Sequence, residues 1–302
     1  MPLSRAEAIV HVGLPKTGST TIQSFLALNA EALSRQGVHW VPPHIAKSSQ
    51  LEYALAACSQ AGQLVDDAMF LNNFALRTLE DQNRLIQDFL EGLDQQIASL
   101  EGKFIISSEH IGVWMHAPHL RATLDNFLTQ RFASVRYIMF VRPQTDFILS
   151  SYSESVKRGS ARTLEAFVRD YDEINIHDAM TRWQAELGNR VRFAMLNRGN
   201  AGSDDLISVF CKAAEFSEQG LTRPAPSNES LPATALEILR RANAVIGKDI
   251  ERNILQRLIF SVVRRLVTHT FTRGARLALS PEQAADINRR YPHPVEALVN
   301  SF

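Results

Sequence analysis

The sequence has few cysteines: Cys58 and Cys211 are its only two, and they lie far apart in the chain. Two cysteines cannot form the dense disulfide network of a small secreted domain, and there is no CxxC pair of the kind that binds zinc. The N-terminal residues contain no long apolar stretch, so we expect no signal peptide. These absences favour the cytoplasm as the compartment.

The chain also lacks an excess of charge of either sign. Its 302 residues contain 32 Lys and Arg against 32 Asp and Glu, a formal net charge of zero. Nucleic-acid-binding domains are commonly basic, so we expect no nucleic-acid partner. The most apolar stretch near the C-terminus, residues 258–267, is short and contains Arg264 and Arg265, so we expect no membrane span. With 45% hydrophobic residues, the composition is that of a folded protein with a full core.

Apolar segments typical of buried strands alternate with segments of helical spacing. The strand candidates are residues 8–12, 103–107, 135–141 and 191–196. Helical spacing is found at residues 20–33, 79–100, 120–132, 147–156, 164–171 and 178–187. This alternation predicts an α/β fold whose parallel sheet is covered by helices on both faces.

The C-terminal part of the chain is helical in pattern. Residues 233–266 are mostly helical, and Ser280-Pro281 predicts the start of the last helix, with Ser280 as the N-cap. We expect the apolar face of residues 254–266 to pack on the core, with the arginines of that helix in solvent. We expect a single domain over residues 1–302, and the alternative is a separate helical domain from about residue 228.

A glycine-bearing loop, Gly13-Leu-Pro-Lys-Thr-Gly-Ser-Thr-Thr21, lies between the first predicted strand and the first predicted helix. Such a loop presents backbone N–H groups and the positive end of the helix dipole to an anion. A nucleotide-hydrolysing P-loop has the pattern GxxxxGK[ST]. Gly13 and Gly18 keep that spacing, but Ser19 stands where the lysine belongs and the lysine is Lys16. The loop therefore predicts phosphate binding with a displaced cation.

This loop resembles the 5′-phosphosulfate loop of sulfotransferases that use 3′-phosphoadenosine 5′-phosphosulfate (PAPS). The family pattern is Pro-Lys-[Ser/Thr]-Gly-[Thr/Ser]-Thr, and residues 15–20 match it at every position. The resemblance implies a P-loop-like central sheet and PAPS as co-substrate, with no metal required. It implies that Lys16 stabilises the bridging oxygen during catalysis. It also implies a set of residues around the 5′-phosphate: Lys16, Thr17, Gly18, Ser19, Thr20 and Thr21. The adenine-stacking Trp that often ends the family's loop is replaced here by Thr21.

A second element agrees with this resemblance. The strand candidate ending at Val141 is followed by Arg142, and Ser150 lies eight residues later on a predicted helix. In the same family, an Arg and a Ser at this spacing hold the 3′-phosphate of the nucleotide, through a bidentate guanidinium and a hydroxyl. Arg273-Gly274 partly resembles a late Arg-Lys-Gly stretch that closes on the same phosphate, but the lysine is missing. A basic loop beside a helix explains Arg273 and Gly274 equally well.

The acceptor hydroxyl needs a base near the sulfur. Family members carry a His or a Glu just after the strand that lies between the two nucleotide motifs. Here Glu109 and His110 directly follow residues 104–108. By position we expect Glu109 to be the base and keep His110 as the second candidate. A structural role for Glu109, as a helix cap or in a salt bridge, is the alternative.

Together these residues predict a PAPS-dependent sulfotransferase that transfers a sulfuryl group to a hydroxyl or amine acceptor by in-line displacement. The acceptor is a carbohydrate, a lipid or a small metabolite, and residues 42–78 and 153–180 are the candidates for its binding wall. One alternative is a nucleotide or small-molecule kinase with an atypical P-loop. Another is a non-catalytic nucleotide-binding protein. No pattern in the sequence predicts an oligomeric state.

Overall fold

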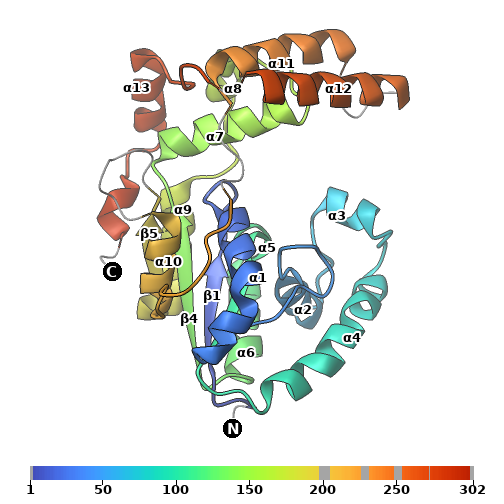
Figure 1. Ribbon diagram of the computed structural model, residues 1–302, viewed down its shortest axis with the longest axis vertical. Helices are drawn as coiled ribbons and strands as arrows, with labels where there is room; N and C mark the ends of the chain where they lie inside the picture. The colour runs from blue at the N-terminus through green and yellow to red at the C-terminus, as the bar shows by residue number, and fades with distance from the viewer. Residues whose placement is uncertain (1–2, 197–204, 226–230, 248–253, 272, 300–302) are drawn as a thin grey trace. The chain divides into compact units, whose positions relative to one another are not determined.

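The structure is a computed structural model that describes the chain except for residues 1–2, 197–204, 226–230, 248–253, 272 and 300–302 (Figure 1). The chain divides into two compact units. Unit 1 consists of residues 1–141, 178–227 and 296–302, and unit 2 consists of residues 142–177 and 228–295. The single domain over residues 1–302 stays a prediction.

Unit 1 is built on a five-stranded parallel sheet with the strand order β2-β3-β1-β4-β5. Its strands are β1 (Glu7–Val12), β2 (Val38–Trp40), β3 (Lys103–Ser108), β4 (Ser134–Val141) and β5 (Val191–Met195). The predicted α/β class and parallel sheet are confirmed, and four of these strands match the predicted segments. The strand β2 was not predicted, because three residues are too few to show a periodic pattern.

Helices follow the strands of unit 1. They are α1 (Ser19–Arg35), α2 (Glu52–Gln60), α3 (Ala68–Asn73), α4 (Leu79–Ile97), α5 (Glu109–Trp114), α6 (Pro118–Thr129), α9 (Ile176–Leu187, which begins in unit 2) and α10 (Leu206–Ala214). The described part of unit 1 also contains the 3-10 turns η1 (Gly188–Arg190) and η3 (Val295–Leu298, which begins in unit 2). Helix α4 begins with a capping box in which Thr78 and Asp81 satisfy each other's backbone N–H groups.

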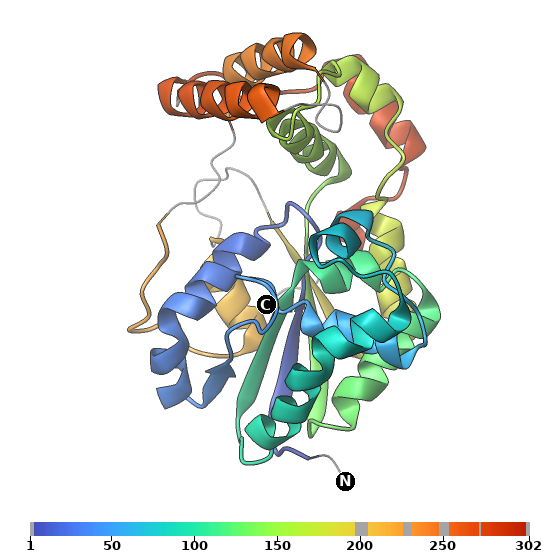
Figure 2. The same cartoon turned by 90° about the vertical axis from the view of Figure 1, so that its right-hand side faces the viewer.

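The helices cover both faces of the sheet. On one face, Ile9 and Ile138 pack with Phe210 in the core beneath α1 and α10. On the other face, the ring of Tyr137 lies 5.7 Å from the ring of Trp183 on α9. Figure 2 shows α1 and α10 on one side of the strands, and α2, α4 and α6 on the other. Strands covered on both sides explain the continuous apolar runs in the sequence.

The register aligns the carboxyl ends of the central strands. Val12, the last residue of β1, pairs with Ser108 at the end of β3 and with Met139 near the end of β4. In parallel sheets, ligands bind beyond the carboxyl ends of the strands. The residues that follow β1 and β3 are Gly13 and Glu109. They therefore lie at the same end of the sheet, beyond the carboxyl ends of the strands.

Unit 2 is helical in its described part. Its helices are α7 (Gln144–Lys157), α8 (Leu164–Arg169), α11 (Ala233–Ile246), α12 (Ile254–Thr270) and α13 (Pro281–Arg290). The buried Asn243 of α11 donates to the carbonyl groups of Val156 and Ser160, each at 2.9 Å, and so satisfies acceptors at the end of α7. Helix α13 begins as predicted, with Ser280 in a capping box and Pro281 at its first position.

The prediction that the apolar face of residues 254–266 packs on the core is wrong for the described side chains. Leu255, Leu258, Ile259, Val262 and Leu266 have exposed fractions from 43% to 64%. Helix α12 packs beside α11 in an antiparallel pair (Figure 1), and among the described side chains of α12 the buried apolar one is Val267. No helix in the described part of the chain combines the length and apolarity needed to cross a bilayer.

Candidate functional site

The loop between β1 and α1 has an unusual backbone. Lys16 has φ 65° and Gly18 has φ 90°, so both adopt the left-handed conformation. A non-glycine residue pays about 1–2 kcal/mol for that conformation. Gly18 is the N-cap of α1, and a Cβ at this position would lie 2.4 Å from the side chain of Leu206. The left-handed backbone therefore favours glycine at position 18, and the loop holds the half-buried Lys16 in a strained conformation of the kind found at functional sites.

Hydroxyl groups of the loop differ in what they contact. The buried Thr17 donates from Oγ1 to the carbonyl of Leu14 at 2.7 Å, so its hydroxyl closes the loop on itself. The Ser19 hydroxyl is buried and has no hydrogen-bond partner among the described residues. Thr20 is exposed and Thr21 is half-buried. An unsatisfied buried hydroxyl is uncommon in native proteins, and an anion in the loop would satisfy it.

The N-terminus of α1 suits an anion. Gly18 offers no side chain to cap the helix, and the first turn carries no acidic residue. The first backbone N–H groups of a helix have no acceptor within the helix itself. Together with the helix dipole, these groups attract a phosphate or sulfate group.

Two close backbone approaches press the loop against α5. A Cβ on Gly13 would lie 2.5 Å from the Ser19 hydroxyl and 2.9 Å from the Glu109 Cα atom. A Cβ on Gly112, within α5, would lie 2.2 Å from the Gly13 carbonyl oxygen. Only glycine fits at either position without a shift. The structure thus brings the predicted loop and Glu109 together. Both follow the carboxyl ends of neighbouring strands, β1 and β3.

Glu109 and His110 begin α5 directly after the N-cap Ser108. Both are half-buried. The His110 ring lies 4.6 Å from the Trp114 ring, and its Nδ1 lies 3.0 Å from the Ser49 hydroxyl. Burial lowers the pKa of His110, while the charges of Glu109 and Asp67 act in the opposite direction. His110 is therefore held by Ser49 and Trp114 and favours its neutral form.

The segment before α2 braces the end of β3, and no sequence pattern predicted this. Gln50 donates its backbone N–H to the carbonyl of Ser107 at 3.1 Å, and its Oε1 accepts the Ser107 N–H at 2.7 Å. The Ser49 hydroxyl lies 3.0 Å from the Ser108 hydroxyl. These bonds join residues nearly 60 positions apart, so only the folded chain reveals them. They fix the position from which Glu109 and His110 emerge.

The remaining predicted residues belong to unit 2. Arg142 is buried and comes directly before Pro143, the N-cap of α7, while Ser150 is half-buried within α7. Arg273 and Gly274 lie in the connection from α12 to α13, and Arg273 is exposed. A Cβ on Gly274 would lie 3.0 Å from the side chain of Pro232, the N-cap of α11. Arg142 thus precedes α7 and Ser150 lies in its middle, whereas Gly274 lies against the start of α11.

The described residues contain no cluster of three or more His, Cys, Asp or Glu side chains able to hold a metal ion. Compared with known proteins, the chain matches no protein-family model and no curated protein.

Proposed function

We propose that this protein is a PAPS-dependent sulfotransferase with a P-loop-like fold. It would transfer a sulfuryl group from PAPS to a hydroxyl or amine acceptor. The observation that carries the proposal is the loop from Gly13 to Gly18. It leaves the carboxyl end of the central strand β1, opens the uncapped helix α1, carries Lys16, and packs against Glu109.

The proposed reaction is an in-line displacement. The acceptor oxygen or nitrogen forms a bond to sulfur while the bond from sulfur to the bridging phosphate oxygen breaks, and the electron pair stays on that oxygen. Glu109 accepts the acceptor's proton as general base. Lys16, with the N–H groups of the first turn of α1, stabilises the negative charge that develops on the bridging oxygen.

The proposal assigns the 3′-phosphate to residues of unit 2. Arg142, just before α7, supplies a guanidinium, Ser150, in the middle of α7, supplies a hydroxyl, and both groups donate to phosphate oxygens. Arg273 and Gly274 are assigned to the same phosphate. These assignments rest on the family resemblance, and the buried position of Arg142 supports its role because a buried guanidinium is most favourable beside an anion.

Thermal unfolding with two nucleotides tests the proposal. A ligand that binds only the folded state stabilises it by RT ln(1 + [L]/Kd), about 2.7 kcal/mol at a concentration 100-fold above Kd. We expect 3′-phosphoadenosine 5′-phosphate to raise the melting temperature and Mg-ATP to have little effect. A preference for Mg-ATP would indicate a kinase instead. No response to either nucleotide would contradict nucleotide binding altogether.

A further inference from the structure

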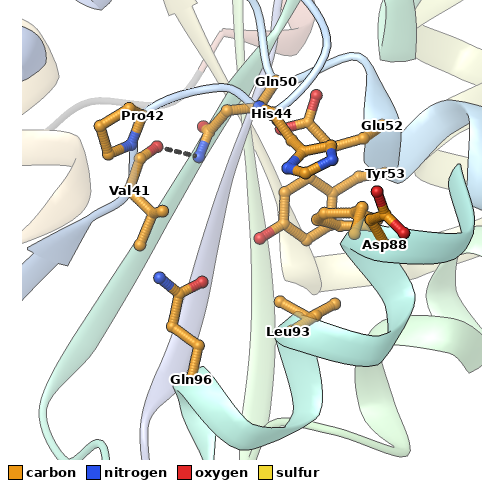
Figure 3. Close-up of a pocket in the computed structure, with 11 residues that line it drawn as sticks. Val41, Pro42, His44, Gln50, Glu52, Tyr53, Asp88, Leu93 and Gln96 are labelled. Carbon is orange, nitrogen blue, oxygen red and sulfur yellow. Dashed lines mark hydrogen bonds between the residues drawn. The ribbon is translucent and has the colours of Figure 1, made fainter.

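Unit 1 contains a pocket of about 290 Å³, and part of its lining belongs to residues 42–78, one of the two segments expected to form the acceptor wall. The segment after β2, the start of α2 and the C-terminal half of α4 form its walls. Figure 3 shows Glu52 and Tyr53 on the α2 wall, with Asp88 and Leu93 on the α4 wall. A volume of this size accommodates a small organic molecule.

The most unusual group in the pocket is the Glu52 carboxylate. Its side chain is 2% exposed. Oε1 accepts the backbone N–H of His44 at 3.1 Å, whereas Oε2 has no hydrogen bond to a described residue. The backbone N–H groups of Ile45 and of Glu52 itself also act on the carboxyl and lower its pKa, but by less than burial raises it. Leaving a buried carboxylate oxygen without a donor is costly, so native proteins rarely do so without a function. A bound ligand with a hydrogen-bond donor would satisfy Oε2.

The charges around the pocket favour a ligand whose hydrogen-bond donor is positively charged. Asp88 adds a second carboxylate, and none of the described lining residues is Lys or Arg. The lining is therefore negative when both carboxyl groups are ionised. A positively charged donor gains from this charge, whereas an anionic ligand is repelled.

Aromatic rings add a second attraction for a cation. The Tyr53 and Phe89 rings lie 5.1 Å apart in an edge-to-face arrangement, and the His44 ring lies 6.3 Å from that of Phe89. Aromatic faces attract ammonium groups through the ring quadrupole. A carboxylate beside aromatic rings is a combination suited to an organic ammonium ion.

The pocket wall is held in place without a ligand. The Gln50 Nε2 donates to the carbonyl of Val41 at 2.9 Å, and its Oε1 accepts from the Ser107 backbone at 2.7 Å. Both Gln50 and Val41 line the pocket. A preformed wall reduces the entropy lost when a ligand binds.

We propose that this pocket binds a small organic molecule through a primary ammonium group, which donates a hydrogen bond to Oε2 of Glu52. The proposal rests on the pocket alone and not on the proposed sulfotransferase activity. Besides Glu52, three titratable side chains line the pocket: His44 from the loop, Tyr53 from α2 and Asp88 from α4. Burial raises the pKa of Glu52 to about 7, so the affinity for a cation rises as the pH increases from 6 to 8.

Calorimetric titration tests the proposal. The probes are n-butylammonium and phenethylammonium chloride, each compared with the alcohol of the same carbon skeleton, at pH 8. We expect saturable binding of at least one ammonium ion and affinity at least about ten-fold weaker for its alcohol, because a charge-assisted hydrogen bond is lost. Equal binding of amine and alcohol, or no binding of either ammonium ion, overturns the proposal.

Two variants identify the contact. Glu52→Gln keeps an oxygen acceptor for the His44 N–H but removes the charge, so we expect affinity for the ammonium probe to fall at least about ten-fold. Glu91→Gln removes an exposed carboxylate of α4 outside the pocket lining and is the matched control, with unchanged affinity. Unchanged affinity in Glu52→Gln contradicts the proposal. Stabilisation by 3′-phosphoadenosine 5′-phosphate is measured separately in each variant, so failure of one proposal is distinguishable from failure of the other.

Discussion

The two regions assigned to the nucleotide hold their candidate groups in different ways. In unit 1, backbone contacts too close for a side chain at Gly13 and Gly112 hold the loop against α5, so the backbone N–H groups of the loop have a fixed position. In unit 2, the candidate cations are two long side chains, the buried Arg142 and the exposed Arg273, and Ser150 adds a hydroxyl. Fixed N–H groups suit the reacting 5′ end, where a small displacement is costly to the rate. Long cationic side chains suit binding of the other phosphate.

The largest effect is expected at Glu109. Glu109→Gln keeps the shape of the side chain but removes the base, so turnover falls by about 10²- to 10⁴-fold while nucleotide affinity stays nearly unchanged. The measurement is sulfuryl transfer from labelled PAPS to an acceptor identified by screening, together with the Kd of 3′-phosphoadenosine 5′-phosphate.

Glu101→Gln is the matched control, because Glu101 is an exposed carboxylate just before β3 and lies outside the site. His110→Asn separates the two candidate bases. Full activity of Glu109→Gln with loss of activity in His110→Asn would reverse the assignment.

Lys16→Ala is expected to lower turnover by about 10²- to 10³-fold, the typical cost of removing one group that stabilises developing charge. Lys212→Ala, an exposed lysine on α10, is the control. A chelator is expected to leave the wild-type rate unchanged. Activity that depends on a chelatable metal but not on Lys16 would contradict the proposed mechanism.

A smaller effect is expected at Arg142 and Arg273, the two arginines of unit 2 that are assigned to the 3′-phosphate. Arg142→Gln is expected to weaken 3′-phosphoadenosine 5′-phosphate binding by about 10- to 100-fold, since a hydrogen bond to a charged group contributes about 1.5–3 kcal/mol. Its affinity for AMP, which lacks the 3′-phosphate, stays unchanged. The exposed Arg273 is screened by solvent, so Arg273→Gln changes the affinity by less than about three-fold. Equal effects of both substitutions on both nucleotides would remove the distinction between buried and exposed cations.

The smallest expected effect is on the pH dependence of the free energy of unfolding, compared between wild type and Glu52→Gln. Burial raises the pKa of Glu52 from 4.5 to about 7, so the folded state binds more protons than the unfolded state within that window. The contribution of Glu52 to stability is therefore present below pH 4.5 and lost as the pH rises through 7. A shift of this size corresponds to about 3 kcal/mol. Urea unfolding should show Glu52→Gln more stable than wild type at pH 8 and nearly equal to it at pH 4.5.

His11 acts in the opposite direction. It is fully buried, its Nδ1 lies 2.8 Å from the Ser107 hydroxyl, and burial lowers its pKa from 6.5 to about 3. The unfolded state then binds the extra proton, so stability falls as the pH drops from 6.5 toward 3. The two effects oppose each other between pH 4.5 and 6.5, so the wild-type stability should be highest and nearly constant there, and should fall on either side. Parallel curves for wild type and Glu52→Gln at every pH would contradict the assignment of the alkaline limb.

Local pattern predicted most of the fold. The four longer strands, the helices α1, α4, α6 and α7, and the capped start of α13 all lie close to their predicted residues, because each depends on the period and end signals of its own segment. Helix α2 was not predicted, since seven of its nine residues are buried and its pattern has no polar face. The exposed face of α12 was not predicted either, because periodicity shows that a helix has an apolar face but not what covers it.

For the candidate site, too, some features follow from the local sequence and others only from the folded chain. The sequence by itself determined which side chains and glycines the loop contains. Gly13, Lys16, Gly18 and Ser19 lie within seven residues of each other, so one turn before a helix can hold them all. It also placed Glu109 after a parallel strand. Only the tertiary structure decided that Gly112 presses on the Gly13 carbonyl, that Gln50 braces Ser107, and that one oxygen of Glu52 lies buried without a donor. Local dihedral preference acts between neighbours in the chain, whereas these contacts form between distant segments and exist only once the core has closed.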